Sequence, residues 1–178
     1  MTLTVSNSLM IAALSTLLTG CGLTQSVSES TASTAHGIFY KQVKTLHLDI
    51  SSRVAMNPHV TDMSGLSVPT LVRVYQLRNG KVMEKASYDN LLSDDDRVLG
   101  SDLLDTQAVV VKPGEGAQLS VPMDKDAQAV TVVALFRQPD TERNTWRLTL
   151  TRDDLEPDRA RVIELGDNRL TLRALAGE

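Results

Sequence analysis

The chain has 178 residues and a net charge of −4, with 18 Lys and Arg against 22 Asp and Glu. Charges of both signs are interspersed and aromatic residues make up only 3% of the chain, which argues against a nucleic-acid-binding protein. The single cysteine excludes an intramolecular disulfide.

The N-terminus carries an uncharged apolar run, Leu9–Leu18, followed by Leu18-Thr19-Gly20-Cys21. Ten apolar residues are too few to span a bilayer, which needs about 20, but they suit a signal peptide. The four residues that end at Cys21 resemble the lipobox of bacterial lipoproteins, which implies cleavage before Cys21 and acylation of that cysteine. Because Gly22 rather than Asp follows, the resemblance also implies export to the outer membrane. The alternative is a buried, unreactive cysteine after an ordinary secretory signal.

The domain organisation follows from this N-terminus. Residues 1–20 are the predicted signal peptide, and residues 21–40 are the predicted lipidated N-terminus and linker, because Thr24–Ala35 is rich in Ser and Thr. Residues 41–178 then form one predicted domain, which is long enough to bury a core.

Strand patterns begin in the second quarter of the chain. Leu46, Leu48 and Ile50 alternate with polar residues, as in a half-buried strand. Residues 70–77 (TLVRVYQL) are strongly β-prone. Asn79-Gly80 then predicts a hairpin turn, with residues 81–86 returning as a short strand.

The segment 87–99 (SYDNLLSDDDRVL) predicts a short helix instead. Ser87 is a suitable N-cap and the apolar residues recur near helical spacing, with a break expected around Ser93. Asp94, Asp95 and Asp96 lack the alternating spacing of a calcium loop, so we expect a solvated acidic face rather than a cation site.

Strand patterns resume over residues 106–111, 117–121, 129–136, 145–149, 161–165 and 169–175. The segment 129–136 (AVTVVALF) is apolar on both faces and predicts a central strand. Gly166-Asp167-Asn168 predicts a last hairpin turn. Seven or eight short strands with frequent turns predict an all-β fold, a two-sheet antiparallel β-sandwich with one or two short extra helices.

No constellation of catalytic or metal-binding residues emerges. The three histidines, His36, His47 and His59, are scattered, and no nucleotide-binding or hydrolase motif occurs. Trp146 is expected in the core. We therefore predict a protein that is not an enzyme and needs neither a metal nor a cofactor beyond the covalent lipid on Cys21.

The segment 55–68 (AMNPHVTDMSGLSV) is long for a loop in a compact domain and carries several apolar side chains. Adaptable Met side chains on a loop suggest a protein contact. The alternative is that these side chains fold back onto the core.

Several stretches together resemble the TssJ (SciN) family of outer-membrane lipoproteins of the type VI secretion system. They are the lipobox at Cys21, the Asn57-Pro58 loop after the first strand, residues 69–77 (PTLVRVYQL), the acidic helix near Tyr88 and Asp89, residues 134–137 (ALFR) and Trp146-Arg147. The resemblance covers roughly residues 44–173.

The resemblance implies a transthyretin-like sandwich and a non-catalytic anchoring role. TssJ-like proteins bind the periplasmic C-terminal part of TssM, and through it join TssL, while their lipid holds them at the outer membrane. In the family, the loop between the first two strands contacts TssM. In this chain the expected contact residues are Met56, Asn57, Pro58, His59, Val60, Asp62 and Met63.

Other classes of envelope lipoprotein stay open at the level of sequence. A β-sandwich that binds a small ligand or a glycan is one, although the scarcity of aromatic residues disfavours it. A pilotin-like assembly factor is the other.

Overall fold

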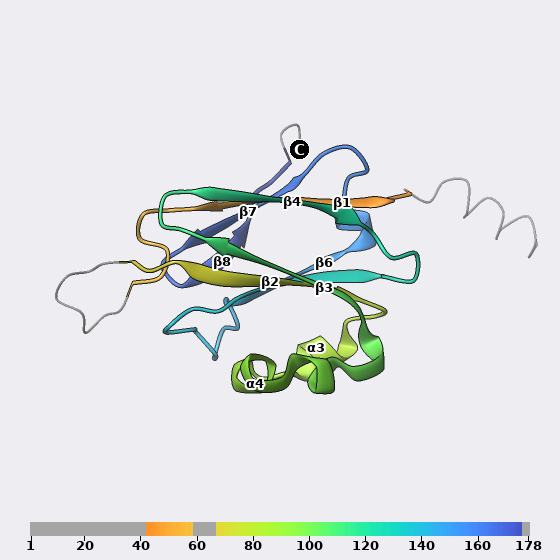
Figure 1. Ribbon diagram of the computed structural model, residues 1–178, viewed down its shortest axis with the longest axis horizontal. Helices are drawn as coiled ribbons and strands as arrows, with labels where there is room; N and C mark the ends of the chain where they lie inside the picture. Colours follow the sequence, from red (N-terminus) through yellow and green to blue (C-terminus); the bar gives the residue numbers. More distant parts are fainter. Residues whose placement is uncertain (1–41, 59–66, 176–178) are drawn as a thin grey trace, which may run out of the picture. The chain divides into compact units, whose positions relative to one another are not determined.

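The computed structural model describes residues 42–58 and 67–175, and within them eight strands form two four-stranded sheets (Figure 1). In the first sheet the strand order is β4-β1-β7-β8, and in the second it is β3-β2-β5-β6. The strands are β1 (Thr45–Ser52), β2 (Thr70–Leu77), β3 (Leu103–Val111), β4 (Gly116–Pro122), β5 (Ala129–Ala134), β6 (Arg147–Thr151), β7 (Arg161–Gly166) and β8 (Arg169–Leu172). The predicted two-sheet sandwich is confirmed.

One strand pair differs from the antiparallel prediction. β1 pairs with β4 antiparallel but with β7 parallel, whereas all pairs in the second sheet are antiparallel. Strands joined by a tight hairpin must be antiparallel, but β1 and β7 are more than 100 residues apart. No short connection therefore constrains their direction.

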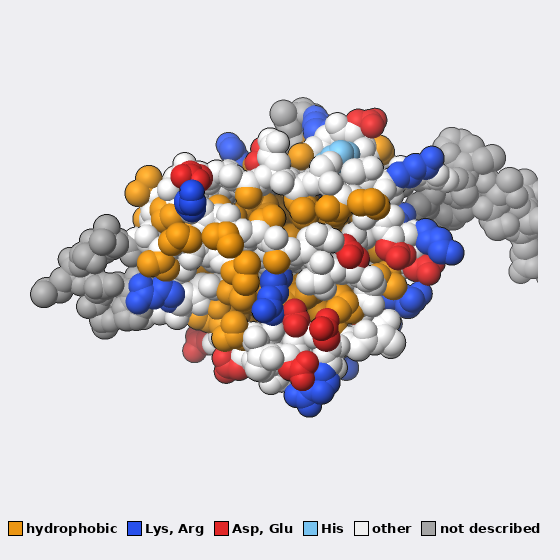
Figure 2. Space-filling model, viewed as in Figure 1, with side chains coloured by type: hydrophobic (Ala, Val, Ile, Leu, Met, Phe, Trp, Pro, Cys, Tyr) orange, Lys and Arg blue, Asp and Glu red, His pale blue; other side chains and the backbone are white. Residues whose placement is uncertain are grey.

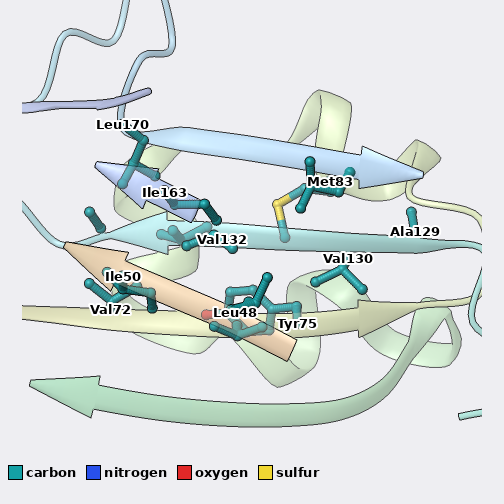
Figure 3. Close-up of a cluster of buried hydrophobic side chains, with 14 of the residues drawn as sticks. Leu48, Ile50, Val72, Tyr75, Met83, Ala129, Val130, Val132, Ile163 and Leu170 are labelled. Atoms are coloured by element: carbon teal, nitrogen blue, oxygen red, sulfur yellow. The ribbon is translucent and has the colours of Figure 1, made fainter. Parts of the chain in front are cut away.

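The core forms where the two sheets face each other. Leu46, Leu48 and Ile50 of β1 are at most 1% exposed, which confirms the alternation read from the sequence. Figure 3 shows Ile50 of β1 beside Val72 of β2 within this cluster of buried side chains. All six residues of β5 are buried, on both of its faces, which confirms a central strand.

The predicted hairpin at Asn79-Gly80 is wrong, and residues 81–85 form a helix, α3 (Lys81–Lys85), instead of a strand. Both edges of β2 are already paired, with β3 and β5, so no edge is free for a returning strand. The backbone N–H groups of Asn79 and Gly80 donate to the buried Asp102 carboxylate at 2.8 and 3.1 Å. Gly80 adopts a left-handed φ of 75°, which turns the chain out of the sheet.

The helix predicted over 87–99 is present as α4 (Tyr88–Leu99). The Ser87 hydroxyl accepts a hydrogen bond from the Asn90 N–H at 3.3 Å, so Ser87 is the N-cap. The helix is interrupted at Asp94, where φ is −159° and ψ is 69°, one residue beyond the predicted break. A 3₁₀ turn at 100–102 follows α4, and another occupies residues 152–154 after β6.

Asp95 corrects the prediction of a fully solvated acidic face. Its Oδ2 accepts hydrogen bonds from the Tyr75 hydroxyl at 2.7 Å and from Nη1 of Arg73 at 3.0 Å. Both donors lie on β2, so this carboxylate ties α4 to the second sheet. Asp94, by contrast, pairs with the Nε of Arg97 at 2.7 Å near the surface, and that hydrogen bond lowers the pKa of Asp94.

Trp146 and Arg147, at the start of β6, complete the contact between the helices and the sheet. Trp146 is fully buried, as predicted, and meets the Tyr88 ring edge-on at a centroid distance of 5.1 Å. The neighbouring Arg147 guanidinium donates to the backbone carbonyls of Met83, Glu84 and Ala86 at the end of α3. A cation at a helix C-terminus satisfies carbonyls that have no partner within the helix.

Replacing Tyr75 by Phe tests the tie between α4 and the sheet. We expect Tyr75→Phe to lower the free energy of unfolding at pH 7 by about 1–2 kcal/mol, because it removes a hydrogen bond to a charged acceptor. Burial and the Asp95 hydrogen bond raise the pKa of Tyr75 above its ordinary value of 10.0. The folded state therefore holds this proton more tightly than the unfolded state, and the stability that Tyr75 contributes is lost as the pH rises above about 10.

Urea unfolding of both proteins at pH 7 and at pH 10.5 measures this effect. The stability gap between the wild type and Tyr75→Phe should narrow at the higher pH. A gap that is unchanged or wider at pH 10.5 would contradict the proposed tie.

Candidate functional site: the neck of the 55–68 loop

The first leg of the loop, residues 53–58, is held by the β7–β8 hairpin. The Arg53 N–H donates to the Leu165 carbonyl at 2.9 Å. The N–H groups of Asp167 and Asn168 donate to the carbonyls of Ala55 and Met56 at 2.8 and 3.0 Å. Asp167 and Asn168 have φ of 52° and 57°, the left-handed pair of a two-residue hairpin turn. The predicted turn at Gly166-Asp167-Asn168 is thus confirmed, and it also supports the loop.

The turn between β3 and β4 holds the other side of this leg. The Ser52 hydroxyl donates to the carbonyls of Lys112 and Glu115 at 2.7 and 2.8 Å. The Gly114 N–H donates to the Arg53 carbonyl at 3.3 Å, and Gly114 has a left-handed φ of 76°. Residues 53–58 are therefore fixed between two turns that are remote in sequence.

Asn57 closes the loop at its base. Its side chain is 1% exposed, and its Nδ2 donates to the Thr70 hydroxyl at 2.9 Å while its Oδ1 accepts from the Arg137 N–H at 3.0 Å. Thr70 is the first residue of β2, so one amide joins the entry of the loop to its exit. Asn168 adds a hydrogen bond from its Nδ2 to the Pro58 carbonyl at 3.2 Å. We call the contacts of Asn57 and Pro58 with Thr70, Arg137 and Asn168 the neck.

The structure places only three of the seven predicted contact residues. Met56 and Asn57 are buried and Pro58 is half-buried, whereas His59, Val60, Asp62 and Met63 lie outside the described residues. The side chains of Met56 and Asn57 offer no surface to a partner in the free chain. We therefore assign these two to holding the loop, and the contact roles of the other five stay predictions. Cys21 also lies outside the described residues.

Sequence reasoning missed the residues that complete the neck. Thr70 was part of a predicted strand, and Arg137 and Asn168 were placed next to or within turns. Their hydrogen bonds to the loop join residues 13 to 110 positions apart, and no local pattern marks such a pairing. Asn57-Pro58 was the one local signal of the neck in the sequence, because Asn is favoured where a side chain forms hydrogen bonds with the backbone of a loop.

The described residues contain no group of three or more His, Cys, Asp or Glu side chains that could hold a metal ion. Within the same ranges, no helix is long and apolar enough to cross a membrane. The fold and the site thus define a two-sheet β-sandwich with an anchored loop at one end.

The comparisons with known proteins agree with this class. The family model T6SS-SciN, described as type VI secretion lipoprotein (VasD, EvfM, TssJ), matches residues 44–172. The chain belongs to this family, whose members are structural lipoproteins of the type VI secretion system and not enzymes. A search of the curated proteins gave no match.

Solved structures show the same fold. A chain in the structure titled "Type VI membrane complex" is 39% identical, with a TM-score of 0.70, and the match covers 75% of this chain and 100% of that one. A chain in the structure titled "T6SS protein TssM C-terminal domain (869-1107) from EAEC" is 37% identical, with a TM-score of 0.68 and the same coverage. The lipoprotein TssJ1 from Pseudomonas aeruginosa, 23% identical over 75% of this chain and 99% of its own with a TM-score of 0.60, supports the fold alone.

Replacing Asn57 by Ala tests the neck. We expect Asn57→Ala to lower the free energy of unfolding by about 2–3 kcal/mol, because the Thr70 hydroxyl and the Arg137 N–H lose their partner in a buried site. Asn90→Ala on α4 is a matched control, since Asn90 is exposed, and we expect a change within about 0.5 kcal/mol. Chemical denaturation measures both, and equal effects of the two substitutions would contradict the neck.

Proposed function

We propose that this chain anchors the type VI secretion membrane complex to the outer membrane by binding the periplasmic C-terminal domain of TssM. The lipid on Cys21 holds the domain at the membrane, and the domain faces the periplasm. TssL joins the assembly indirectly, through TssM. The loop over residues 55–68 supplies the TssM contact.

The observation that carries this proposal is the similarity to the chain in the structure named for the TssM C-terminal domain. The segment numbered 869–1107 in that name is longer than this entire chain. The matched chain, however, is covered in full by three quarters of this chain. The matched chain is therefore too short to be the named TssM segment. This supports the interpretation that the structure contains a TssJ-like chain together with TssM.

The neck supports the choice of the loop as the contact. A loop whose two ends are fixed loses less conformational freedom when it binds than one that moves freely. The hydrogen bonds of Asn57 and Asn168 fix these ends without using the residues between them. A contact made by the residues between these ends would then start from a fixed base.

The lipid anchor supports the assembly role. Each buried methylene of an acyl chain contributes roughly 0.8 kcal/mol, so several chains on Cys21 hold the domain firmly. Confinement to the membrane raises the effective concentration of the domain toward a partner that crosses the periplasm. A modest intrinsic affinity for TssM is then sufficient for stable assembly.

Calorimetric titration tests the partner and the site together. The full chain, purified in detergent, is titrated with the purified C-terminal periplasmic segment of the cognate TssM. In a loop variant, residues 59–66 are replaced by eight Gly and Ser residues, which keeps Asn57 and Thr70 in place. We expect saturable one-site binding that is lost in the variant. Equal binding by both proteins would keep TssM as the partner but move the site elsewhere.

Replacing Cys21 by Ser separates anchoring from recognition. We expect Cys21→Ser protein, produced with a cleavable secretory signal, to bind the TssM segment with unchanged affinity but to leave cells unable to secrete type VI substrates. Immunoblotting must show a normal periplasmic level of the variant. Full secretion by such cells would contradict the anchoring role.

A further inference from the structure

The edge of the second sheet at β3 is an unusual surface for a soluble domain. Among the described residues, β3 pairs only with β2, so its other edge has no strand partner. The segment Thr106–Val111 contains no charged residue, no Pro and no Gly. Natural edge strands are normally protected by Lys, Pro or bulges, and an edge without them is a template for another strand. The register shift near Leu103 leaves Thr106–Val111 in regular pairing with β2.

Exposed apolar side chains follow this edge. Val110 is 61% exposed and Val54 is 78% exposed, the two highest values among the large hydrophobic residues of the described ranges. Figure 2 shows hydrophobic side chains gathered on this face of the molecule, over β3 and β4. We call Val54, Ala108 and Val110 the apolar strip.

The apolar strip is continuous with the base of the loop. Val54 lies in the first leg of the loop, and its Cγ2 stands close to Gly114 in the turn that follows β3. The hydrogen bond from the Gly114 N–H to the Arg53 carbonyl joins the same two segments. A partner that docks on the loop therefore reaches the strip without leaving the surface.

The other end of β3 offers a second kind of contact. A groove of about 330 Å³ lies between the edges of β3 and β4, lined by Leu104, Val121, Asp105 and Asp124 among others. Asp105 accepts hydrogen bonds from the side-chain amides of Gln76 and Gln107, and Asp124 accepts one from the Asp126 N–H. Neither carboxylate takes part in any ion pair found among the described residues. Two carboxylates without a cation favour a Lys or Arg side chain from a partner.

We propose that an extended segment of the loop's partner pairs as an additional strand along β3, with apolar side chains over the apolar strip and a basic side chain over the groove. The distance from Asp105 to Val110 along the strand is about 17 Å, so a segment of about six residues suffices. Main-chain hydrogen bonds supply affinity in this mode of recognition, and alternate side chains supply specificity. This inference rests on the proposed function and adds a second contact to it.

Substitution of Val110 by Lys tests the strip. The full chain in detergent is titrated with the C-terminal periplasmic segment of the cognate TssM, as before. We expect Val110→Lys to weaken binding at least about tenfold, because it removes an apolar contact and adds a charge. Val82→Lys is the matched control, because Val82 is 37% exposed and lies on α3, whose last carbonyls bind Arg147 of β6 at the opposite edge of the sheet, and we expect unchanged affinity. Amide hydrogen exchange should also show protection of residues 106–111 on binding.

The outcomes separate this inference from the proposed function. Unchanged affinity of Val110→Lys, with binding still lost in the loop variant, would overturn the strand contact alone. Absence of binding by the wild-type chain would overturn both. Should Val110→Lys melt at a lower temperature than the wild type, Val54→Lys replaces it, since Val54 is outside the sheet. Unchanged affinity of that variant, together with no protection of residues 106–111, would equally overturn the proposal.

Discussion

The geometry of the loop depends on one buried side chain amide. Asn57 offers one donor group and one acceptor oxygen, and the fold supplies a partner for each, from the start of β2 and from the segment after β5. An unpaired buried amide is costly, so the fold and the loop conformation stabilise each other. Because Thr70 begins β2, the same hydrogen bond sets the point at which the chain re-enters the sheet. The loop thus enters and leaves the sandwich at points that these hydrogen bonds fix.

The contact between the helices and the second sheet is stabilised in a different way. The outer face of the second sheet is covered by α3 and α4 (Figure 1), and charged groups fix these helices to it. Asp95 accepts from Tyr75 and Arg73, and Arg147 caps the carbonyls at the end of α3. The helices thereby bury the outer face of β5, which is why that strand is apolar on both sides. The two most exposed large hydrophobic side chains of the described residues, Val54 and Val110, lie outside these helices, beside the loop and on β3.

The sequence predicted what depends on local patterns. The alternation in β1, the two-sided apolar run of β5, the Ser87 cap and the Asp167-Asn168 turn each follow from residues within a few positions of one another. Asn79-Gly80 misled the prediction because a hairpin turn needs a free sheet edge, and only the tertiary pairing of β2 shows that none exists. Asp95 was misplaced for a similar reason, since its partners lie 20 and 22 residues earlier in the chain.

The candidate site shows the same limit. Composition marked residues 55–68 as a long loop with apolar side chains, and left open whether these contact a partner or fold back onto the core. It did not distinguish the side chains that hold the loop, such as Met56 and Asn57, from the rest of the loop. That distinction needs the positions of Arg137 and Asn168, which come close to the loop only in the folded chain. Likewise, the exposure of Val110 follows from β3 lying at a sheet edge, which its sequence does not reveal.

Site-specific crosslinking in intact cells tests the central claim, that the loop is the contact with TssM, most directly. A photoreactive amino acid is introduced at His59 in the full-length lipoprotein, and at the exposed Gln118 on β4 as the control. The account predicts an adduct between this chain and TssM from position 59, formed only on irradiation, and none from position 118. An adduct from position 118 alone, with both variants present at the wild-type level, would contradict it.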